Sequence, residues 1–373
     1  MKILITNTIF ETYTGTEVVV RDLAPAFARA GHTPIVFAGK LGAIAEELRA
    51  HGIQVTDNLA QIDGAPDIIH GHHHQQLMEA LLYFPETPAI YLSHDGSSMV
   101  DEPIYFPRIL RYFAVDDRCR NRILQTVGSA AGEVPLMPNA VDLDRFLLRP
   151  PLPAKPRRAL LFSNYARNDT YLPEVRKACD RAGISLDVMG AGTGTASSAP
   201  EKELPGYDLV FAKARCALEA MATGCAVILC DFAGSGPYVT SAAFEEMRRK
   251  NFGRALLTQP LKADVLLREI QRYDAADAAA VSQRLRLKAG LEEAAGQWLA
   301  IYSTVLQDFD GQAIDRDGEG RAASAYIKKW HTFQRREWEK DQVARLKQIP
   351  LIGNLVYRVI HRWLWRLSSE GKF

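Results

Sequence analysis

Short apolar runs alternate with helical patterns along most of the chain. Runs that predict strands lie at 3–6, 34–38, 67–70, 89–93, 112–115 and 134–137, and then at 159–163, 185–190, 207–211, 226–230 and 254–257. Helices are expected between several of these runs. Continuous apolar strands of this kind are typical of parallel sheets that are covered on both faces. The pattern therefore predicts an α/β protein with two doubly wound, Rossmann-like domains that face a cleft.

The two series of strands are separated by the segment RPPLPAKPRR at 149–158. This segment is rich in proline and charge and has no apolar period, so we interpret it as a linker. The expected organisation is a domain at 1–150, a domain at 151–310 and a helical tail at 311–373. A chain of 373 residues with 47% hydrophobic content can form two cores of ordinary size.

One β-α-β unit at 207–231 presents a carboxylate near its expected ligand edge. An apolar strand ending at Phe211 leads into an Ala-rich helix that carries Glu219, and Gly224 lies where that helix must end. Ligands of parallel sheets gather at the carboxyl ends of the strands, and a helix N-terminus favours phosphate or another anion. We expect Glu219, near the start of its helix, to lie at such a site.

Several segments resemble, in the right order, the glycosyltransferases of family 4, which have the GT-B fold. LEAMATG followed by DFAGSG resembles the family's donor-binding segment. The segments MKILITNT, TGTE and AGHTPIVFA resemble its opening strand, glycine loop and first helix. DIIHGHH and AIYLSHDG resemble its two histidine-bearing strand ends, and VPLMPNAVDLDRF resembles its interdomain segment, usually PNGVD. The resemblance covers roughly the first 305 residues.

The resemblance implies that the second domain binds a nucleotide-diphosphate sugar and that Glu219 holds its ribose. Arg167, in SNYARND, would take the place of the family arginine at the diphosphate, and Lys213 and Arg215 would supply further positive charge. The alternative for these three basic residues is ordinary solvated charge at a loop. The other expected donor-binding residues are glycines or a serine in loops: Gly15, Gly190, Gly234 and Ser235.

The chain departs from the family pattern at two places. Phe211 stands eight residues before Glu219, where members usually carry a first glutamate. No lysine follows Arg167 at the usual place. These departures leave the donor sugar and retention at the anomeric carbon open.

In the first domain, the resemblance assigns the transferred sugar to a histidine at a strand end. His94 would donate a hydrogen bond to that sugar and stabilise charge at the anomeric centre, with Asp95 as its catalytic neighbour. Thr16 and His72 are predicted to contact substrate, and Gly15 would let the backbone approach the sugar diphosphate closely. The alternatives are a histidine that caps its strand and a glycine that turns the chain into a helix.

Two cofactor chemistries are disfavoured by the residues themselves. His70, His72, His73 and His74 could hold zinc at a strand end, but the spacing fixes no further carboxylate or cysteine ligand, so we expect no metal. The glycine loop MGAGTGT is followed by the polar, proline-broken TASSAPEKELPGYD, whereas a dinucleotide fingerprint needs a helix there. No cofactor is expected apart from the nucleotide sugar as co-substrate.

The five cysteines form no C-x-x-C pair and mostly lie within apolar runs, which favours a reduced, cytoplasmic protein. No run is apolar and long enough to predict a signal peptide or a membrane-spanning helix. A cytoplasmic location, with a peripheral position on the inner face of the membrane as an alternative, is therefore expected.

The tail is basic and rich in tryptophan. Residues 320–373 hold twelve Lys/Arg against four Asp/Glu, so the net charge of +1 leaves the first 319 residues at about −7. A polar helix is predicted at 322–348. After Pro350 and Gly353, Arg358, Arg362 and Arg366 form a basic stripe on an apolar segment at 354–367, which suits an anionic membrane surface. Packing on the protein's own first domain or on a second subunit is the alternative, and nucleic acid is not expected as a partner.

The sequence thus predicts a metal-independent glycosyltransferase that uses a nucleotide-diphosphate sugar. Resemblance implies retention and a glycan or lipid-linked acceptor, as in assembly of a bacterial surface polysaccharide or glycolipid. A nucleotide-sugar epimerase of the same fold and a catalytically inactive scaffold remain as alternatives, and a homo-oligomer remains open.

Overall fold

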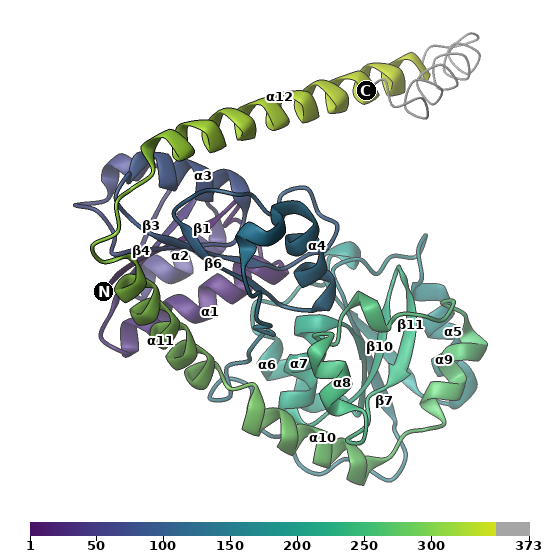
Figure 1. Cartoon of the computed structure of the whole chain (residues 1–373). Helices are drawn as coiled ribbons and strands as arrows, with labels where there is room; N and C mark the ends of the chain where they lie inside the picture. The colour runs from purple at the N-terminus through teal and green to yellow at the C-terminus, as the bar shows by residue number, and fades with distance from the viewer. Residues whose placement is uncertain (348–373) are drawn as a thin grey trace. The chain divides into compact units, whose positions relative to one another are not determined.

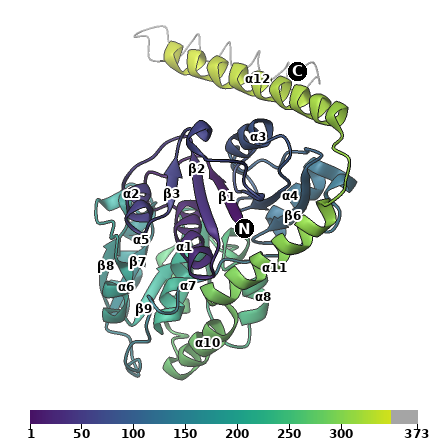
Figure 2. The same cartoon turned by 90° about the vertical axis from the view of Figure 1, so that its left-hand side faces the viewer.

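The computed structural model describes the backbone of residues 1–347 and the side chains of residues 1–332 and 334. The chain divides into two compact units, of which the first, Met1–Ile314, holds two α/β domains built on separate sheets (Figures 1 and 2). The second unit begins at Asp315. Its described part is one long helix, α12 (Arg316–Lys347), which covers residues 322–347 of the polar helix predicted at 322–348.

The first domain is built on a six-stranded parallel sheet in the order β3-β2-β1-β4-β5-β6. The strands are β1 (Lys2–Asn7), β2 (Thr33–Ala38), β3 (Gln54–Thr56), β4 (Ile68–Gly71), β5 (Ala89–Ser93) and β6 (Ile109–Ala114). The helices are α1 (Gly15–Arg29), α2 (Ala43–Ala50), α3 (His74–Tyr83) and α4 (Asp117–Val127), with 3₁₀ turns at Leu59–Gln61 and Gly128–Ala131. The strand order reverses between β1 and β4, and ligands of open α/β sheets bind outside the strand ends at such a point.

The second domain is built on a five-stranded sheet in the order β11-β10-β9-β7-β8, in which only β11 is antiparallel. The strands are β7 (Arg158–Phe162), β8 (Ser185–Met189), β9 (Leu209–Ala212), β10 (Ala226–Asp231) and β11 (Gly234–Tyr238). The helices are α5 (Leu172–Ala182), α6 (Pro200–Glu203), α7 (Ala214–Thr223), α8 (Phe244–Arg249), α9 (Ala263–Ile270) and α10 (Ala275–Lys288), with 3₁₀ turns at Ala191–Thr193, Leu204–Gly206 and Arg254–Leu256.

Alternate side chains of the second sheet enter two different cores, because successive strand residues point to opposite faces. Leu160 and Val210 pack with residues of α7 and α10. Leu161 and Phe211 pack on the other face with residues of α5 and α9. Phe211 has no exposed surface. The position of the missing glutamate is therefore an interior position in this chain, where an unpaired carboxylate would be costly.

The last helix of the first unit, α11 (Leu291–Phe309), returns to the first domain and lies along α1 (Figure 1). Tyr302 packs edge-on against Phe27 of α1, with ring centroids 5.7 Å apart. Trp298 packs in the same way on Phe113 of β6, with ring centroids 5.0 Å apart. The chain therefore crosses between the domains twice, once at the segment before β7 and once at the α10–α11 junction.

Three local expectations were wrong. The segment 134–137 is not a strand but makes an isolated bridge through Leu136, because Pro135 and Pro138 have no N–H to extend a ladder. Where a strand was expected at 254–257, residues Arg254–Leu256 form a 3₁₀ turn. The loop expected at 234–236 is instead the start of the edge strand β11.

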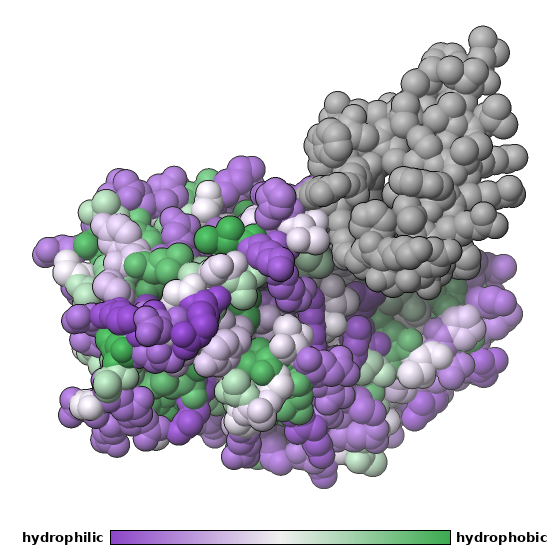
Figure 3. Space-filling model, turned by 45° about the horizontal axis from the view of Figure 1, so that its top comes forward, coloured by the Kyte–Doolittle hydropathy of each residue, from purple (hydrophilic) through white to green (hydrophobic). Residues whose placement is uncertain are grey.

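Hydrophilic side chains cover most of the face seen in Figure 3, and hydrophobic side chains are scattered among them. Scattered exposed apolar residues are usual on protein surfaces. Within residues 1–347, no helix has the length and apolar character needed to cross a membrane. The segment predicted to contact membrane, 354–367, lies outside the described residues.

Candidate functional site

The loops that follow the strands of both sheets meet at one interdomain cleft. Asn164, in the loop after β7, donates a hydrogen bond to the carbonyl of Tyr13, in the loop after β1, at 3.5 Å. Arg215 at the start of α7 forms an ion pair with Asp22 of α1. Because both contacts join the two domains, the carboxyl ends of the strands face each other across the cleft.

The connection between β9 and α7 is a single residue, Lys213. Ala214, the first residue of α7, has a positive φ of 47°, and its N–H donates to the carbonyl of Phe252 at 2.8 Å. Asn251 and Phe252 also have positive φ angles, 51° and 48°. Such angles are unfavourable for residues other than glycine and persist where the surrounding structure enforces them. The strained backbone places the N-terminus of α7 directly at the edge of the sheet.

Glu219 lies in the second turn of α7 rather than at its start, and it is buried. Its Oε1 accepts a hydrogen bond from Nε of Arg215 at 3.0 Å. Burial raises the pKa of Glu219, although the positive charge of Arg215 opposes this. Arg215 also pairs with Asp22, which Arg21 contacts at 2.7 Å. Burial alone would raise the pKa of Asp22, but Arg215 and Arg21 hold it below its usual value.

Lys213 lies beside Tyr165, one of a pair of aromatic side chains that the sequence reasoning did not single out. Its Nζ forms an ion pair with Asp231 at 2.7 Å and lies 5.4 Å from the ring centroid of Tyr165. The rings of Tyr165 and Phe232 meet edge to face at 5.4 Å and are 54% and 50% exposed. Exposed aromatic rings beside a cation are suited to stacking on planar or sugar groups. Their signal in the sequence was an aromatic residue just after two strands, in SNYAR and DFAG.

The remaining predicted donor residues have different surroundings. A side chain at Gly190 would place its Cβ 2.0 Å from the carbonyl oxygen of Ser163, so this glycine lets the loops after β7 and β8 pack together. Arg167 is exposed in the loop after β7. Ser235 is buried in β11, and its hydroxyl donates to the carbonyl of Pro260 at 3.3 Å, while Gly234 precedes it in the same strand.

At the start of α1, Gly15 is exposed and Thr16 is partly exposed. No atom lies within 4 Å of the position that a Cβ on Gly15 would take, so the space around it is open. Both oxygens of Glu17 bind the preceding loop, with Oε2 accepting from the backbone N–H of Thr14 at 2.8 Å and Oε1 from that of Thr12 at 3.1 Å. Glu17 therefore holds the loop that carries the predicted glycine.

His72 and His94 lie together at the ends of β4 and β5. Nδ1 of His72 and Nε2 of His94 are 2.6 Å apart, and their rings stack with centroids 4.8 Å apart. His70 stacks on the other side of His72 at 4.5 Å and hydrogen-bonds Tyr302 of α11 at 2.6 Å. Burial lowers the pKa of His70 to about 3 and the pKa values of His72 and His94 well below the usual range. The stack is therefore uncharged at neutral pH.

The loop that carries His94 and Asp95 is fixed by a carboxylate that the sequence analysis missed. Asp101 accepts hydrogen bonds from the backbone N–H groups of both residues and from the hydroxyl of Tyr91 at 2.9 Å. Burial raises the pKa of Asp101 to about 8 against these donors. Burial would raise the pKa of Asp95 as well, but hydrogen bonds from Ser97 and its neighbour lower it. No sequence motif marks Asp101, because its role depends on the path of a loop.

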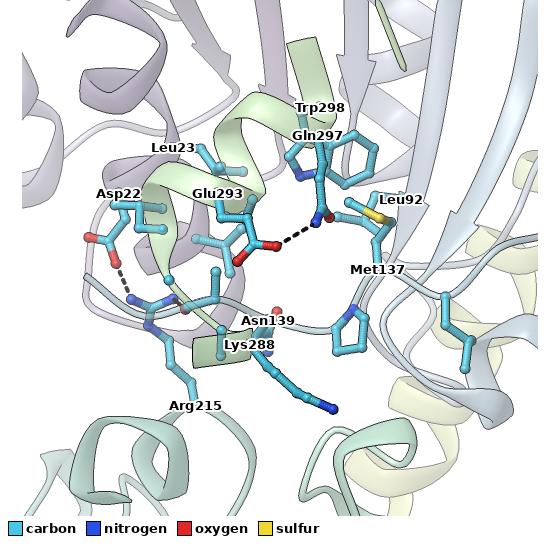
Figure 4. Close-up of a pocket in the computed structure, with 18 of the residues that line it drawn as sticks. Asp22, Leu23, Leu92, Met137, Asn139, Arg215, Lys288, Glu293, Gln297 and Trp298 are labelled. Carbon is cyan, nitrogen blue, oxygen red and sulfur yellow. Dashed lines mark hydrogen bonds and ion pairs between the residues drawn. The ribbon is translucent and has the colours of Figure 1, made fainter. Parts of the chain in front are cut away.

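A cavity of about 240 Å³ lies beneath this part of the cleft (Figure 4). Asp22 and Arg215 lie on one side of it, and Glu293, Gln297 and Trp298 enter from α11. The interdomain segment that contains Met137 and Asn139 forms part of the wall. The cavity therefore adjoins both the Arg215–Glu219 pair and the strand that leads to His94.

The structure thus brings the predicted residues together in two groups. Lys213, Arg215 and Glu219 lie just before or within the first two turns of α7. His72 and His94 are hydrogen-bonded at the edge of the first sheet. Among residues 1–332 and 334, no three His, Cys, Asp or Glu side chains are grouped closely enough to hold a metal ion. All five cysteines are free thiols, and four of them are buried.

Comparison with known proteins identifies relatives of this architecture. Residues 13–145 match the family model for Glycosyltransferase Family 4. No curated protein sequence matches the chain significantly. Among solved structures, HepE of Anabaena in complex with UDP and glucose is similar, with a TM-score of 0.57 at 15% identity over 82% of this chain and 100% of that one. Sucrose-phosphate synthase of Thermosynechococcus elongatus has a TM-score of 0.56 at 15% identity, over 82% and 99% of the two chains. The predicted GT-B fold is confirmed.

Proposed function

We propose that this chain, a GT-B protein that resembles glycosyltransferase family 4, transfers a sugar from a nucleotide diphosphate to an acceptor hydroxyl. The observation that carries the proposal is the arrangement at the start of α7, where the helix N-terminus, Lys213 and the Arg215–Glu219 pair lie at the cleft edge of the second sheet. Helix N-termini and basic side chains favour a diphosphate. HepE was crystallised with UDP and glucose and with UDP-glucose, which makes a UDP-sugar the first donor to test.

In the proposed reaction, the acceptor oxygen forms a bond to the anomeric carbon while the bond from that carbon to the diphosphate breaks. The electron pair of the broken bond stays on the diphosphate, which also takes the acceptor proton. The new bond forms on the same face, with retention. Lys213, Arg167 and the N-terminus of α7 would stabilise the leaving diphosphate, and Glu219 would hold the ribose. No metal is required for this assignment.

On the side of the first domain, His94 would contact the transferred sugar as a neutral imidazole. Its low pKa means that it positions a sugar hydroxyl by hydrogen bonding rather than by positive charge. His72 fixes the orientation of that ring through the bond between Nδ1 and Nε2. The same edge of the first sheet carries Asp95 after β5, and Gly15 and Thr16 at the start of α1. The acceptor that we propose is a glycan or lipid-linked glycan of a bacterial surface polysaccharide or glycolipid.

An inactive relative is the second candidate, because Glu219 already binds Arg215 and the β9–α7 connection has only one residue. A thermal-shift and calorimetric screen against UDP, GDP, ADP, CMP and their common sugars separates the two functions. A ligand that binds only the folded protein raises its stability. Selective stabilisation by one nucleotide supports the transferase, and no response from folded protein favours the scaffold. Turnover of the nucleotide sugar without any acceptor would instead indicate an epimerase.

Replacement of Glu219 tests its proposed contact with the ribose. Glu219→Gln should raise the Kd of the stabilising nucleotide by about tenfold, because a hydrogen bond to a charged group contributes about 1.5–3 kcal/mol. Isothermal titration calorimetry measures this change. Glu246→Gln is the matched control, since Glu246 lies on α8 in an exposed ion pair with Lys250 and should leave the Kd unchanged. Equal affinity of Glu219→Gln and the unmodified protein would remove Glu219 from the site.

A further inference from the structure

Among the described residues, no carboxylate forms an ion pair with Arg248, one of the arginines that line the cavity. Arg248, on α8, donates from Nη2 to the carbonyl of Pro138 at 3.4 Å. Its Nη1 is buried and has no hydrogen-bond partner among the described residues. A buried guanidinium with an unused N–H group is costly, because desolvation is not compensated. Burial also lowers the pKa of Arg248, to about 10, which still leaves it charged at neutral pH.

The other basic residues that line the cavity are already neutralised. Arg215 pairs with Asp22 and Glu219. Lys288 pairs with Glu245 at 2.5 Å. Of the carboxylates in the lining, Asp22 is held by arginines, and Glu293 accepts a hydrogen bond from Gln297 at 3.4 Å. Arg248 is therefore the lining cation that has no ion pair within the described part of the chain, so it can receive an incoming anion.

Another part of the lining is apolar and includes an aromatic ring. Leu23, Leu92, Met137 and Trp298 line it. The volume of about 240 Å³ is smaller than the roughly 300–1,000 Å³ that is usual for drug-sized ligands, so a single sugar unit fits better than a whole nucleotide. An aromatic ring with a nearby cation suits the apolar face of a sugar that carries an acidic group.

We propose that this cavity binds an acidic sugar unit of the acceptor, with its carboxylate or phosphate on Arg248. The assignment to the acceptor rests on the proposed function. Leu92 lines the cavity from β5, and His94 follows two residues later, just after that strand ends, so the bound unit would lie near the predicted sugar-transfer residue. The anion site itself rests only on the cavity and on Arg248. A guanidinium can bind either oxyanion in bidentate fashion, so both acids share one recognition chemistry.

The test is calorimetric titration of the full chain with glucuronate, with glucose 1-phosphate and with glucose. We expect at least one of the two acids to bind, and glucose to bind at least tenfold more weakly. Arg248→Met keeps the alkyl chain and should weaken binding of that acid by about tenfold or more. The control Arg249→Met, at an exposed position of α8 outside the cavity lining, should change it less than about threefold. Tighter binding of glucuronate would indicate a carboxylate on the acceptor, and tighter binding of glucose 1-phosphate would indicate a phosphate.

A second variant keeps the test decisive if Arg248→Met folds poorly. Ala294→Leu leaves Arg248 in place and narrows the cavity, so it should also weaken acid binding. The proposal would be overturned if the unmodified protein bound neither acid. It would also be overturned if both variants bound the acid as tightly as the unmodified protein. Nucleotide binding should be unchanged in Arg248→Met. Acid binding without any nucleotide binding would leave the anion site standing and refute the transferase function instead.

Discussion

At the scale of single residues, most charged side chains of the cleft form ion pairs with one another. Asp22 binds Arg21 and Arg215, and Arg215 in turn binds Glu219. A buried ion network of this kind fixes geometry more than it adds stability, because desolvation offsets the attraction. A donor diphosphate would therefore enter a site whose cations are already oriented. Arg167 is different, because it is exposed in the loop after β7.

The stacked histidines give the protein a specific dependence on pH. The folded pKa of His70 is about 3, below the usual value near 6.5, so the unfolded chain takes up a proton that the folded chain excludes. Stability is complete above about pH 6.5 and falls as the pH drops toward 3. When the pH falls from 7.5 to 5.5, the free energy of unfolding should decrease in both proteins. The decrease should be about 1.4 kcal/mol smaller in His70→Gln than in the unmodified protein, as measured by urea unfolding.

The control for this prediction removes the same hydrogen bond without removing a titrating group. Tyr302→Phe deletes the hydroxyl that bonds Nδ1 of His70. It should lower the free energy of unfolding by a similar amount at both pH values. If His70→Gln retains the full pH dependence, His70 does not carry it.

At the scale of elements, the strand pattern predicted most of both sheets, because short apolar runs between helical patterns are typical of buried parallel strands. The short strand β3 and the edge strand β11 were missed: Gln54–Thr56 is only three residues long, and Gly234–Tyr238 contains glycines and a proline that suggest a turn. The proximity of His72 and His94 could be predicted from neighbouring strand ends. The Asp22–Arg215 pair could not, because no local pattern relates residues 193 positions apart on different domains.

The strained backbone at the first residue of α7 can be tested by substitution. Ala214 has a φ of 47°, which costs an L-residue about 1–2 kcal/mol but costs glycine little. Ala214→Gly should therefore leave the free energy of unfolding unchanged or raise it by up to about 1 kcal/mol. Ala220→Gly, at a buried position later in the same helix, should lower it by about 1 kcal/mol or more. Equal destabilisation by both substitutions in urea unfolding would show that Ala214 is not strained.

At the scale of the whole molecule, two crossings tie the domains together. The segment before β7 carries the chain into the second domain, and α11 carries it back to α1. The cavity lies between these crossings, lined by residues of the interdomain segment, α1 and α11. Occupation of the cavity therefore involves both domains at once. The sequence predicted two domains and a cleft, but not which helices enclose its floor, since the return of α11 depends on tertiary packing.

The basic tail is predicted to bring the molecule to an anionic membrane surface. Residues 354–367 combine an apolar segment with Arg358, Arg362 and Arg366, and each basic residue near an anionic surface contributes about 1 kcal/mol. The full chain should float with phosphatidylglycerol vesicles at low salt, and deletion of residues 354–373 should abolish flotation. Replacing the three arginines by glutamine should reduce it strongly, with phosphatidylcholine vesicles and high salt as controls. If the full chain never binds anionic vesicles while its fold is intact, the tail serves a protein contact, and sedimentation of the deleted and full chains would then report whether that contact is with a second copy.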